Sequence, residues 1–288
     1  MEGPEQALSV GGSDGAARVR IGRGEPLVII AGPCVLETVD LAQEIAGGLV
    51  AACAAAGLPL VFKASFDKAN RTSGSAYRGP GLAAGLEMLR AVRDRHGVPV
   101  TTDVHAPEQA EAVAQAVDLL QVPAFLCRQT DLLQACGATG CAVNVKKGQF
   151  QAPWDMGPAV EKLRGAGAGG VMLTERGASF GYNNLVVDMR SLPALRALGV
   201  PVCFDATHSV QQPGGQGTSS GGERKVAPVL ARAAVAVGVA GVFMEAHDDP
   251  DNAPSDGPNM IKINELADIV KLLQDFDGTA KSHPGTIG

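Results

Sequence analysis

Short apolar runs alternate with longer amphipathic segments along most of this chain. Each apolar run has the length of a strand that is buried on both faces, and each longer segment repeats its apolar residues at helical spacing. Eight such strand–helix units in succession predict a single closed (β/α)8 TIM barrel of the α/β class. The predicted strands span residues 27–31, 60–63, 98–102, 119–122, 142–145, 171–174, 200–204 and 242–245. The predicted helices span residues 41–56, 82–95, 107–116, 130–135, 157–166, 192–197, 224–237 and 263–276.

An open, doubly wound sheet is the main alternative for such an alternating pattern. That fold usually carries a Gly-x-Gly-x-x-Gly turn after its first strand. In this chain the turn reads Gly32-Pro33-Cys34. The barrel is therefore favoured.

The N-terminal region differs from the barrel units that follow it. Residues 1–17 are rich in Gly, Ser and Glu, and we expect them to be disordered. Between residues 18 and 30, two short apolar runs flank Gly22-Arg23-Gly24 and predict a short hairpin that leads into the first barrel strand. We therefore expect a disordered segment over 1–17 and a TIM-barrel catalytic domain over 18–288.

Composition narrows the classes of function. Hydrophobic residues make up 45% and charged residues 19%, which is typical of a globular domain. A net charge of −6 without a basic run argues against nucleic-acid binding, although a cleft can still attract a small anion. The six cysteines show no Cys-x-x-Cys pair, which indicates a reducing compartment. No apolar run reaches about 18 residues and no apolar signal core is visible, so we expect a cytoplasmic protein without a membrane partner.

Residues with metal-binding side chains follow three strands that are neighbours in a closed barrel. Cys34 follows the first strand, Asp205 and His208 follow the seventh, and Glu245 ends the eighth with Asp256 in the next loop. The carboxyl ends of barrel strands meet at one face, so Cys34, His208, Glu245 and Asp256 are expected to converge. Thiolate, imidazole and carboxylate together suit Zn²⁺, Fe²⁺ or Mn²⁺. Taken singly, each residue also fits packing, capping or a loop hydrogen bond.

Basic side chains gather at the same predicted face. A lysine at a buried strand end is costly unless it meets an anion, so several together indicate a ligand with phosphate and carboxylate groups. Two alternatives stay open, namely ion pairs with the nearby carboxylates and a Schiff base on one lysine. The basic residues are Lys63, Lys68, Arg71, Lys146, Lys147 and Arg176.

Two further features belong to this face. Asp103 ends the third strand beside Thr102 and His105, where it either orients a ligand hydroxyl or forms an internal salt bridge. The Gly-rich segment 211–222 follows the seventh strand, and its composition suits either a mobile lid or an ordinary surface loop.

Long ordered motifs occur in every predicted barrel unit. They occupy residues 31–37, 63–71, 78–81, 121–126, 144–150, 174–177, 180–190, 204–209 and 249–258. Over about residues 30–265 the chain resembles the 3-deoxy-D-manno-octulosonate 8-phosphate synthase family. The family's metal-independent branch has Asn at the position of Cys34, so the resemblance implies the metal-dependent branch. It further implies a TIM barrel, a homotetramer, and phosphoenolpyruvate and D-arabinose 5-phosphate as substrates.

The resemblance also implies roles for individual residues. The implied ligands of a divalent Zn, Fe, Mn or Co ion are Cys34, His208, Glu245 and Asp256. The implied catalytic residues are Lys63, Lys68, Asp103, Lys146 and His208. The implied substrate-binding residues are Asn70, Arg71, Thr72, Gln121, Phe125, Arg128 and Arg176, with Phe125 and Arg128 supplied by a neighbouring subunit.

Three competing functions remain open. Related synthases that use erythrose 4-phosphate carry Lys-Pro-Arg where this chain has Lys68-Ala69-Asn70-Arg71, so this segment favours arabinose 5-phosphate. A Schiff-base aldolase would use Lys63 or Lys146. A non-catalytic sensor of sugar phosphates predicts loss of a ligand or of a basic residue, and none of these positions is lost. Thr72, where the family commonly has Ser, is a mild departure.

Overall fold

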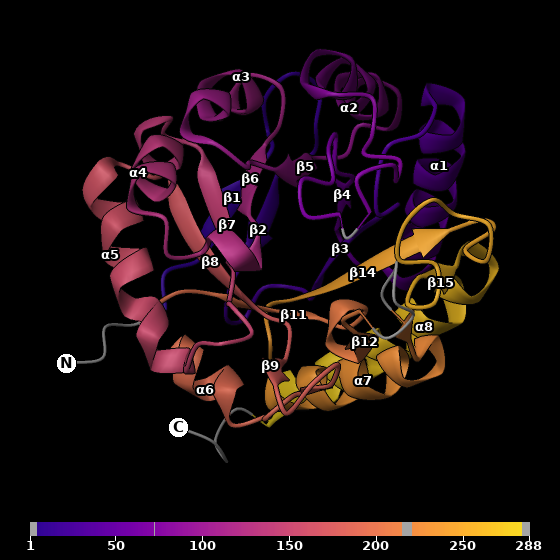
Figure 1. The fold of residues 1–288 in the computed structure, drawn as a ribbon. Helices are drawn as coiled ribbons and strands as arrows, with labels where there is room; N and C mark the ends of the chain where they lie inside the picture. Colours follow the sequence, from indigo (N-terminus) through magenta and orange to yellow (C-terminus); the bar gives the residue numbers. More distant parts are fainter. Residues whose placement is uncertain (1–4, 72, 215–220, 284–288) are drawn as a thin grey trace.

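Eight parallel strands form a closed barrel in the computed structural model, which describes residues 5–71, 73–214 and 221–283. The barrel closes where β11 pairs with β14, with Phe204 beside Val242. The predicted barrel is confirmed, and Figure 1 shows the strands in the centre with the helices around them. The barrel strands are β3 (Val28–Gly32), β4 (Leu60–Lys63), β5 (Val100–Asp103), β6 (Leu119–Val122), β7 (Ala142–Lys146), β8 (Gly170–Glu175), β11 (Val202–Asp205) and β14 (Gly241–His247).

The helices lie close to the predicted ranges. They are α1 (Val39–Ala56), α2 (Leu82–His96), α3 (Ala110–Ala114), α4 (Thr130–Ala138), α5 (Gly157–Ala166), α6 (Ser191–Arg196), α7 (Ala227–Val237) and α8 (Ile263–Ser282). The predicted helices 107–116 and 224–237 each begin as a 3-10 turn, η1 (Pro107–Gln109) and η5 (Arg224–Val226). Helix α8 continues beyond the predicted end at residue 276, where the buried Asp277 accepts a hydrogen bond from the Leu27 amide.

Shorter elements follow the carboxyl ends of several barrel strands. They are η2 (Ala124–Leu126), η3 (Pro153–Met156), the pair β9 (Ala178–Ser179) and β10 (Leu185–Val186), η4 (His208–Val210), the pair β12 (Gln211–Gln212) and β13 (Gly221–Gly222), and β15 (Ile261–Lys262). The segment 211–222 thus begins and ends as an antiparallel ribbon, and its residues 215–220 lie outside the described part of the chain.

Helix α1 illustrates how local sequence sets a barrel helix. The Thr38 side chain accepts a hydrogen bond from the Leu41 amide at the start, and Gly57 ends the helix at φ +65°. Among the described residues, α1 alone has the length and apolar composition of a membrane-spanning helix. Its Ile45 and Leu49 are fully buried in the core that the helices share with the outer face of the barrel.

The N-terminal hairpin was predicted in the wrong place. Strand β1 (Leu8–Val10) pairs antiparallel with β2 (Val19–Ile21), so residues 8–10 form a strand within the segment predicted to be disordered. Leu8 and Ile21 pack with Met172 and Phe243 inside the barrel. Alternation of buried and exposed residues in such three-residue strands is too short a pattern to detect in the sequence. The hairpin closes the amino-terminal end of the barrel, so the cavity opens at the other end.

Candidate active site

A cavity of about 740 Å³ opens at the carboxyl ends of the barrel strands. Its lining combines basic residues, carboxylates and the loop between β14 and β15. The lining residues that the sequence predicted for the site are Lys63, Lys68, Asn70, Arg71, Asp103, Gln121, Phe125, Lys146, Arg176, His208 and Asp256. Residues far apart in the sequence therefore converge on one cavity, as the barrel topology predicts.

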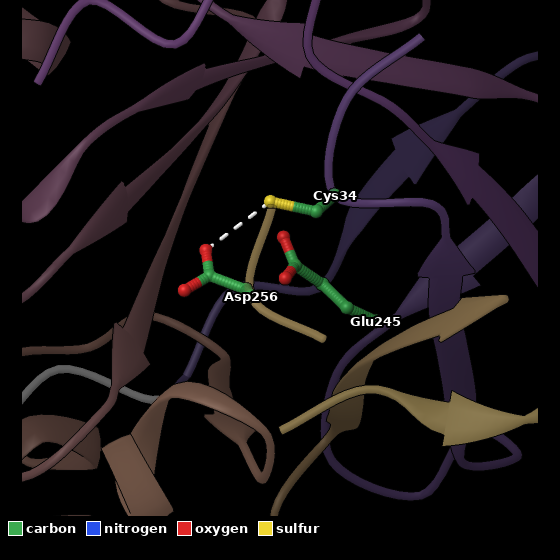
Figure 2. Close-up of side chains that lie close together, drawn as sticks. All are labelled: Cys34, Glu245 and Asp256. Atoms are coloured by element: carbon green, nitrogen blue, oxygen red, sulfur yellow. Dashed lines mark hydrogen bonds between the residues drawn. The ribbon is translucent and has the colours of Figure 1, made fainter. Parts of the chain in front are cut away.

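Three predicted metal ligands face one another beside this cavity, which Asp256 lines and Cys34 and Glu245 do not. Potential ligand atoms of Cys34, Glu245 and Asp256 all lie within 4.8 Å of one another, and Figure 2 shows the three side chains pointing together. The Cys34 Sγ lies 3.2 Å from Asp256 Oδ2. Glu245 is fully buried, and its Oε2 has no hydrogen-bond partner. A buried carboxylate oxygen without a partner is costly, so the arrangement fits a cation that is bound between these residues.

Asp256 is held in an unusual backbone conformation. Its φ is +52°, a left-handed value that is uncommon for residues other than glycine. The Gln211 side chain donates a hydrogen bond to its Oδ1 at 2.7 Å. Burial raises the pKa of Asp256, but His208, Lys68 and the hydrogen bonds from Cys34 and Gln211 outweigh that effect and lower it to about 2. Asp256 is thus an ionised carboxylate at neutral pH.

His208, the fourth predicted ligand, lies on the neighbouring strand beside Glu245 and outside this group of three. Its Nε2 lies 3.6 Å from Glu245 Oε1, and its Nδ1 lies 2.8 Å from Asp205 Oδ2. Asp205 is fully buried at the end of β11 and also accepts a hydrogen bond from the backbone amide of His208. These two contacts fix the imidazole ring, with Nε2 directed toward Glu245. A carboxylate that orients a ligating histidine in this way is common in metal sites.

Lys63 and Lys68 lie against the same carboxylates. The Lys63 Nζ is 3.3 Å from Glu245 Oε1 and 3.7 Å from Asp103 Oδ2. The Lys68 Nζ is 3.7 Å from Glu245 Oε1. Burial lowers the pKa of Lys68, yet the surrounding Cys34, Glu245, Asp103 and Asp256 raise it above its usual value. These lysines thus form ion pairs with carboxylates, which was one of the alternatives given by the sequence. They also line the cavity.

Lys146 also lines the cavity, but different residues hold its side chain. Its Nζ is 2.5 Å from Asp205 Oδ2 and 3.7 Å from the centroid of the Phe243 ring. Burial lowers the pKa of Lys146, and Asp205 opposes that effect. The aromatic face and the carboxylate hold the ammonium group in a buried position at the floor of the cavity.

Arg176 and Arg71 both carry buried nitrogens without partners. One terminal nitrogen of Arg176 donates to Gln211 Oε1 at 2.8 Å, whereas its Nη1 has no partner. Arg71 donates from Nε to the Tyr77 carbonyl at 3.1 Å, and its Nη2 has no partner. Guanidinium groups with free, buried donors that line a cavity suit phosphate or carboxylate oxygens.

Lys147 was predicted to belong to the basic residues at the mouth, and this prediction is wrong. Its Nζ contacts the carbonyl oxygens of Gly148 and Gln151 and lies 3.6 Å from Glu175 Oε1. Lys147 follows Lys146 directly, and successive side chains of a strand point to opposite faces. Lys146 points into the barrel, so Lys147 points outward, where it lines a separate pocket of about 470 Å³.

Two predicted substrate-binding residues lie at or beyond the rim of the cavity. Phe125 lies at the rim of the cavity with 58% of its surface exposed. Arg128 is exposed and does not line the cavity. Thr72 lies outside the described residues. Their proposed roles stay predictions.

Several site residues were not assigned by the sequence patterns. The Cys34 Sγ lies 2.8 Å from Ser255 Oγ, and the Gln211 side chain hydrogen-bonds to both Asp256 and Arg176. Asp205 was noticed at its strand end, but its role in holding His208 was not. Position at a strand end finds residues that point into the mouth, whereas these contacts depend on loop conformations that the sequence does not reveal.

A (β/α)8 barrel with a cavity of ionisable side chains at the carboxyl ends of its strands has the architecture of a TIM-barrel enzyme, whose active site lies at that end. A family model described as the DAHP synthetase I family matches residues 5–282. The chain belongs to this family.

Curated proteins similar to this chain are named 2-dehydro-3-deoxyphosphooctonate aldolase. The protein from Rhodopseudomonas palustris (strain BisB5) is 60% identical over 271 residues, which are 94% of each chain. The protein from Bradyrhizobium sp. (strain BTAi1) is 61% identical over 268 residues, 93% of this chain and 94% of its own. The protein from Nitratidesulfovibrio vulgaris (strain Hildenborough) is 63% identical over 245 residues, 85% of this chain and 90% of its own. The family resemblance stated from the sequence motifs is confirmed.

Proposed function

We propose that this chain condenses phosphoenolpyruvate with D-arabinose 5-phosphate and water. The products are 3-deoxy-D-manno-octulosonate 8-phosphate and inorganic phosphate. One observation carries the proposal, namely that buried cations from three different barrel units surround one cavity large enough for two phosphorylated substrates. The name shared by relatives of about 60% identity supports the same reaction.

The basic residues divide between the two substrates. Lys68, Lys146 and Arg176 hold the phosphate and carboxylate of phosphoenolpyruvate deep in the cavity. The buried, unpartnered Nη1 of Arg176 supports this assignment, because it is a donor suited to an anion. Fixed positive charges stabilise the substrate anions without the reorganisation that water would need.

Arabinose 5-phosphate lies nearer the opening. Lys63, Asn70 and Asp103 contact its hydroxyls, and Arg71 contacts its phosphate, together with Thr72 and Gln121 at the same subsite. We further propose a homotetramer in which Phe125 and Arg128 of one subunit complete this phosphate site in its neighbour. The exposure of both side chains at or beyond the cavity rim supports that arrangement.

The reaction needs two new bonds and one broken bond. C3 of the enol attacks the aldehyde carbon of the sugar, and the aldehyde oxygen takes up a proton. Water adds to C2 and loses a proton, which gives a hemiketal phosphate. The hydroxyl on C2 then loses its proton as the C2–O bond to phosphate breaks, and phosphate leaves with the bonding electron pair, which gives a ketone and inorganic phosphate. Alignment of the two substrates by the fixed lysines and arginines supplies much of the acceleration.

We propose that Cys34, His208, Glu245 and Asp256 hold a divalent Zn, Fe, Mn or Co ion. The donor types and the unpartnered Oε2 of Glu245 fit such an ion. When bound, the ion supplies a positive charge that polarises an oxygen or lowers the pKa of water. Asp205 keeps His208 oriented, and Lys63 neutralises Glu245 on its other side.

We also propose that the protein acts in the cytoplasm. All six cysteines are free, and five of them are buried. Unpaired buried thiols are usual in proteins of reducing compartments.

A phosphate-release assay tests the reaction and the acceptor together. Phosphoenolpyruvate is supplied with either D-arabinose 5-phosphate or erythrose 4-phosphate, and inorganic phosphate is measured over time. We expect phosphate release to depend on the five-carbon sugar and to be at least about a hundredfold slower with the four-carbon sugar, because Asn70 and Arg71 lie in the segment that separates the two groups. Preferential use of erythrose 4-phosphate would overturn the assigned acceptor. Borohydride should trap no imine with a keto substrate, since Lys63 and Lys146 are both held in ion pairs.

A further inference from the structure

A directed row of hydrogen bonds crosses the inside of the barrel below the cavity. Thr174 Oγ1 donates to Asn144 Oδ1 at 2.7 Å, and Asn144 Nδ2 donates to Gln121 Oε1 at 3.0 Å. Gln121 Nε2 then donates to Asp103 Oδ1 at 2.7 Å, while Ser65 Oγ donates to Asp103 Oδ2 at 2.5 Å. We call these five residues the polar belt. They come from five successive barrel strands, β4 to β8, with Ser65 just beyond the end of β4.

The polar belt has a single direction. An ionised carboxylate only accepts hydrogen bonds, so Gln121 must present its NH₂ group to Asp103 and its oxygen to Asn144. Asn144 must then present its NH₂ group to Gln121, which leaves its own oxygen facing Thr174. Only a donor at position 174 satisfies that oxygen, and the Thr174 hydroxyl provides it. The charge on Asp103 therefore sets the orientation of both amides.

The belt differs from the cavity in its exposure. Thr174, Asn144 and Ser65 are fully buried and do not line the cavity, whereas Asp103 and Gln121 do. A buried amide that loses its hydrogen-bond partner in the protein cannot bond to water instead. Loss of one hydrogen bond at one end of the belt therefore disturbs the next hydrogen bond along it. Asp103 accepts from Ser65 and Gln121 and faces Lys63 at 3.7 Å. A carboxylate has about four acceptor positions, which leaves room for one more donor from the cavity.

We infer that Thr174 and Asn144 are positioning residues for sugar recognition, because they fix the Gln121 amide and so keep Asp103 as an acceptor for one hydroxyl of the acceptor sugar. The inference rests on the proposed function in that the cavity-side donor is a sugar hydroxyl. Neither residue touches a substrate, and both act through Gln121 and Asp103. Phosphoenolpyruvate lacks an alcohol group, so the belt distinguishes the two substrates.

The first test separates the Michaelis constants of the two substrates in the metal-loaded enzyme. Thr174→Val removes the terminal hydroxyl and keeps the shape of the side chain. We expect it to raise KM for arabinose 5-phosphate about tenfold, while KM for phosphoenolpyruvate changes less than about twofold. Thr174→Ser retains the donor and should restore the wild-type constants. Thr174→Ala removes the same hydroxyl and replaces the valine variant if that variant does not fold.

Thr101 provides a matched control. It is equally buried in β5, but its Oγ1 donates to the Leu119 carbonyl at 2.7 Å rather than to the belt. Thr101→Val should change both Michaelis constants less than about twofold. The inference is overturned if Thr174→Val and Thr101→Val affect both substrates alike, or if Thr174→Val leaves KM for arabinose 5-phosphate unchanged.

A second measurement does not depend on the reaction. The side-chain amide protons of Asn144 and Gln121 should resist exchange with solvent in the wild type and in Thr101→Val, and should exchange about tenfold faster in Thr174→Val. Equal exchange in all three proteins would show that the belt does not hold these amides. If the wild type fails to consume arabinose 5-phosphate, the proposed function fails, whereas the exchange result still decides the ordering of the belt.

Discussion

Among the single residues of the site, Glu245 gives the strongest indication that a cation binds here. Its Oε1 contacts Lys63 and Lys68, and its Oε2 is buried without a hydrogen-bond partner. One of the two oxygens lies within 4.8 Å of ligand atoms of Cys34 and Asp256. Asp256 itself adopts a left-handed backbone conformation, which costs about 1–3 kcal/mol for a residue with a side chain. Both features lower the stability of the chain by themselves, and both are explained if the residues serve to bind a cation.

Removal of the thiol should weaken metal binding. We expect Cys34→Ala to lower the affinity for a divalent metal about a hundredfold or more, because one ligand is lost while the remaining carboxylates stay in place. Metal titration of the metal-free protein followed by calorimetry measures this change. Cys136→Ala is the control, since Cys136 is equally buried but lies in α4, outside the cluster. An unchanged affinity in Cys34→Ala would remove Cys34 from the site.

Buried thiols outside the site should make the protein sensitive to alkaline pH. Burial raises the pKa of Cys53 and of Cys136 to about 12, from about 9 in an unfolded chain. Each of these thiols therefore contributes to the free energy of unfolding in full below about pH 9. This contribution is lost as the pH rises toward about 12, because the thiol releases its proton at a lower pH in the unfolded chain than in the folded one. Above about pH 9, each thiol should lower the free energy of unfolding by about 1.4 kcal/mol per pH unit.

Denaturant unfolding between about pH 8 and about pH 11 measures this loss. Cys53→Ala should show a shallower decline in the free energy of unfolding than the wild type, because it has one fewer thiol to ionise. Identical pH dependence in the two proteins would contradict the assigned pKa of Cys53.

Single elements differ in how far the sequence predicts them. Both ends of every barrel strand were predicted to within about two residues, because fully buried strands give uninterrupted apolar runs between helical segments. The β1–β2 hairpin was misplaced, since a three-residue strand has too few positions to establish a period. The same limit applies to loops. Ser255 and Gln211 reach the site through loop conformations, and no pattern in the sequence specifies these.

The hairpin should contribute measurably to stability. We expect Leu8→Ala to lower the free energy of unfolding by about 2–5 kcal/mol, because Leu8 is buried in the same hydrophobic cluster as Val10 and Met172. Ser9→Ala, an exposed change in the same strand, should alter it by less than about 0.5 kcal/mol. Equal effects of the two changes on chemical denaturation would instead support a disordered segment over these residues.

The whole molecule combines a net charge of −6 with a cavity lined by cations. The net charge therefore does not predict the charge of the ligand, whereas the lysines at the ends of barrel strands indicate an anionic ligand. That rule placed Lys63, Lys146, Cys34 and Glu245 in the site, since parallel strands of a barrel deliver their carboxyl ends to one face. It failed for Lys147, which is one position beyond Lys146 and points to the other side of the strand. Contacts between subunits, such as those proposed for Phe125 and Arg128, depend on an assembly that a single chain does not contain.

The rate of phosphate release before and after metal removal tests the account most directly. Phosphoenolpyruvate and arabinose 5-phosphate are supplied to one preparation as isolated, after a chelator has removed its metal, and after a divalent ion is added back. We predict that the rate falls at least about a hundredfold when the metal is removed and returns when the ion is restored. A full rate in protein shown to contain no metal would contradict the proposed role of Cys34, His208, Glu245 and Asp256.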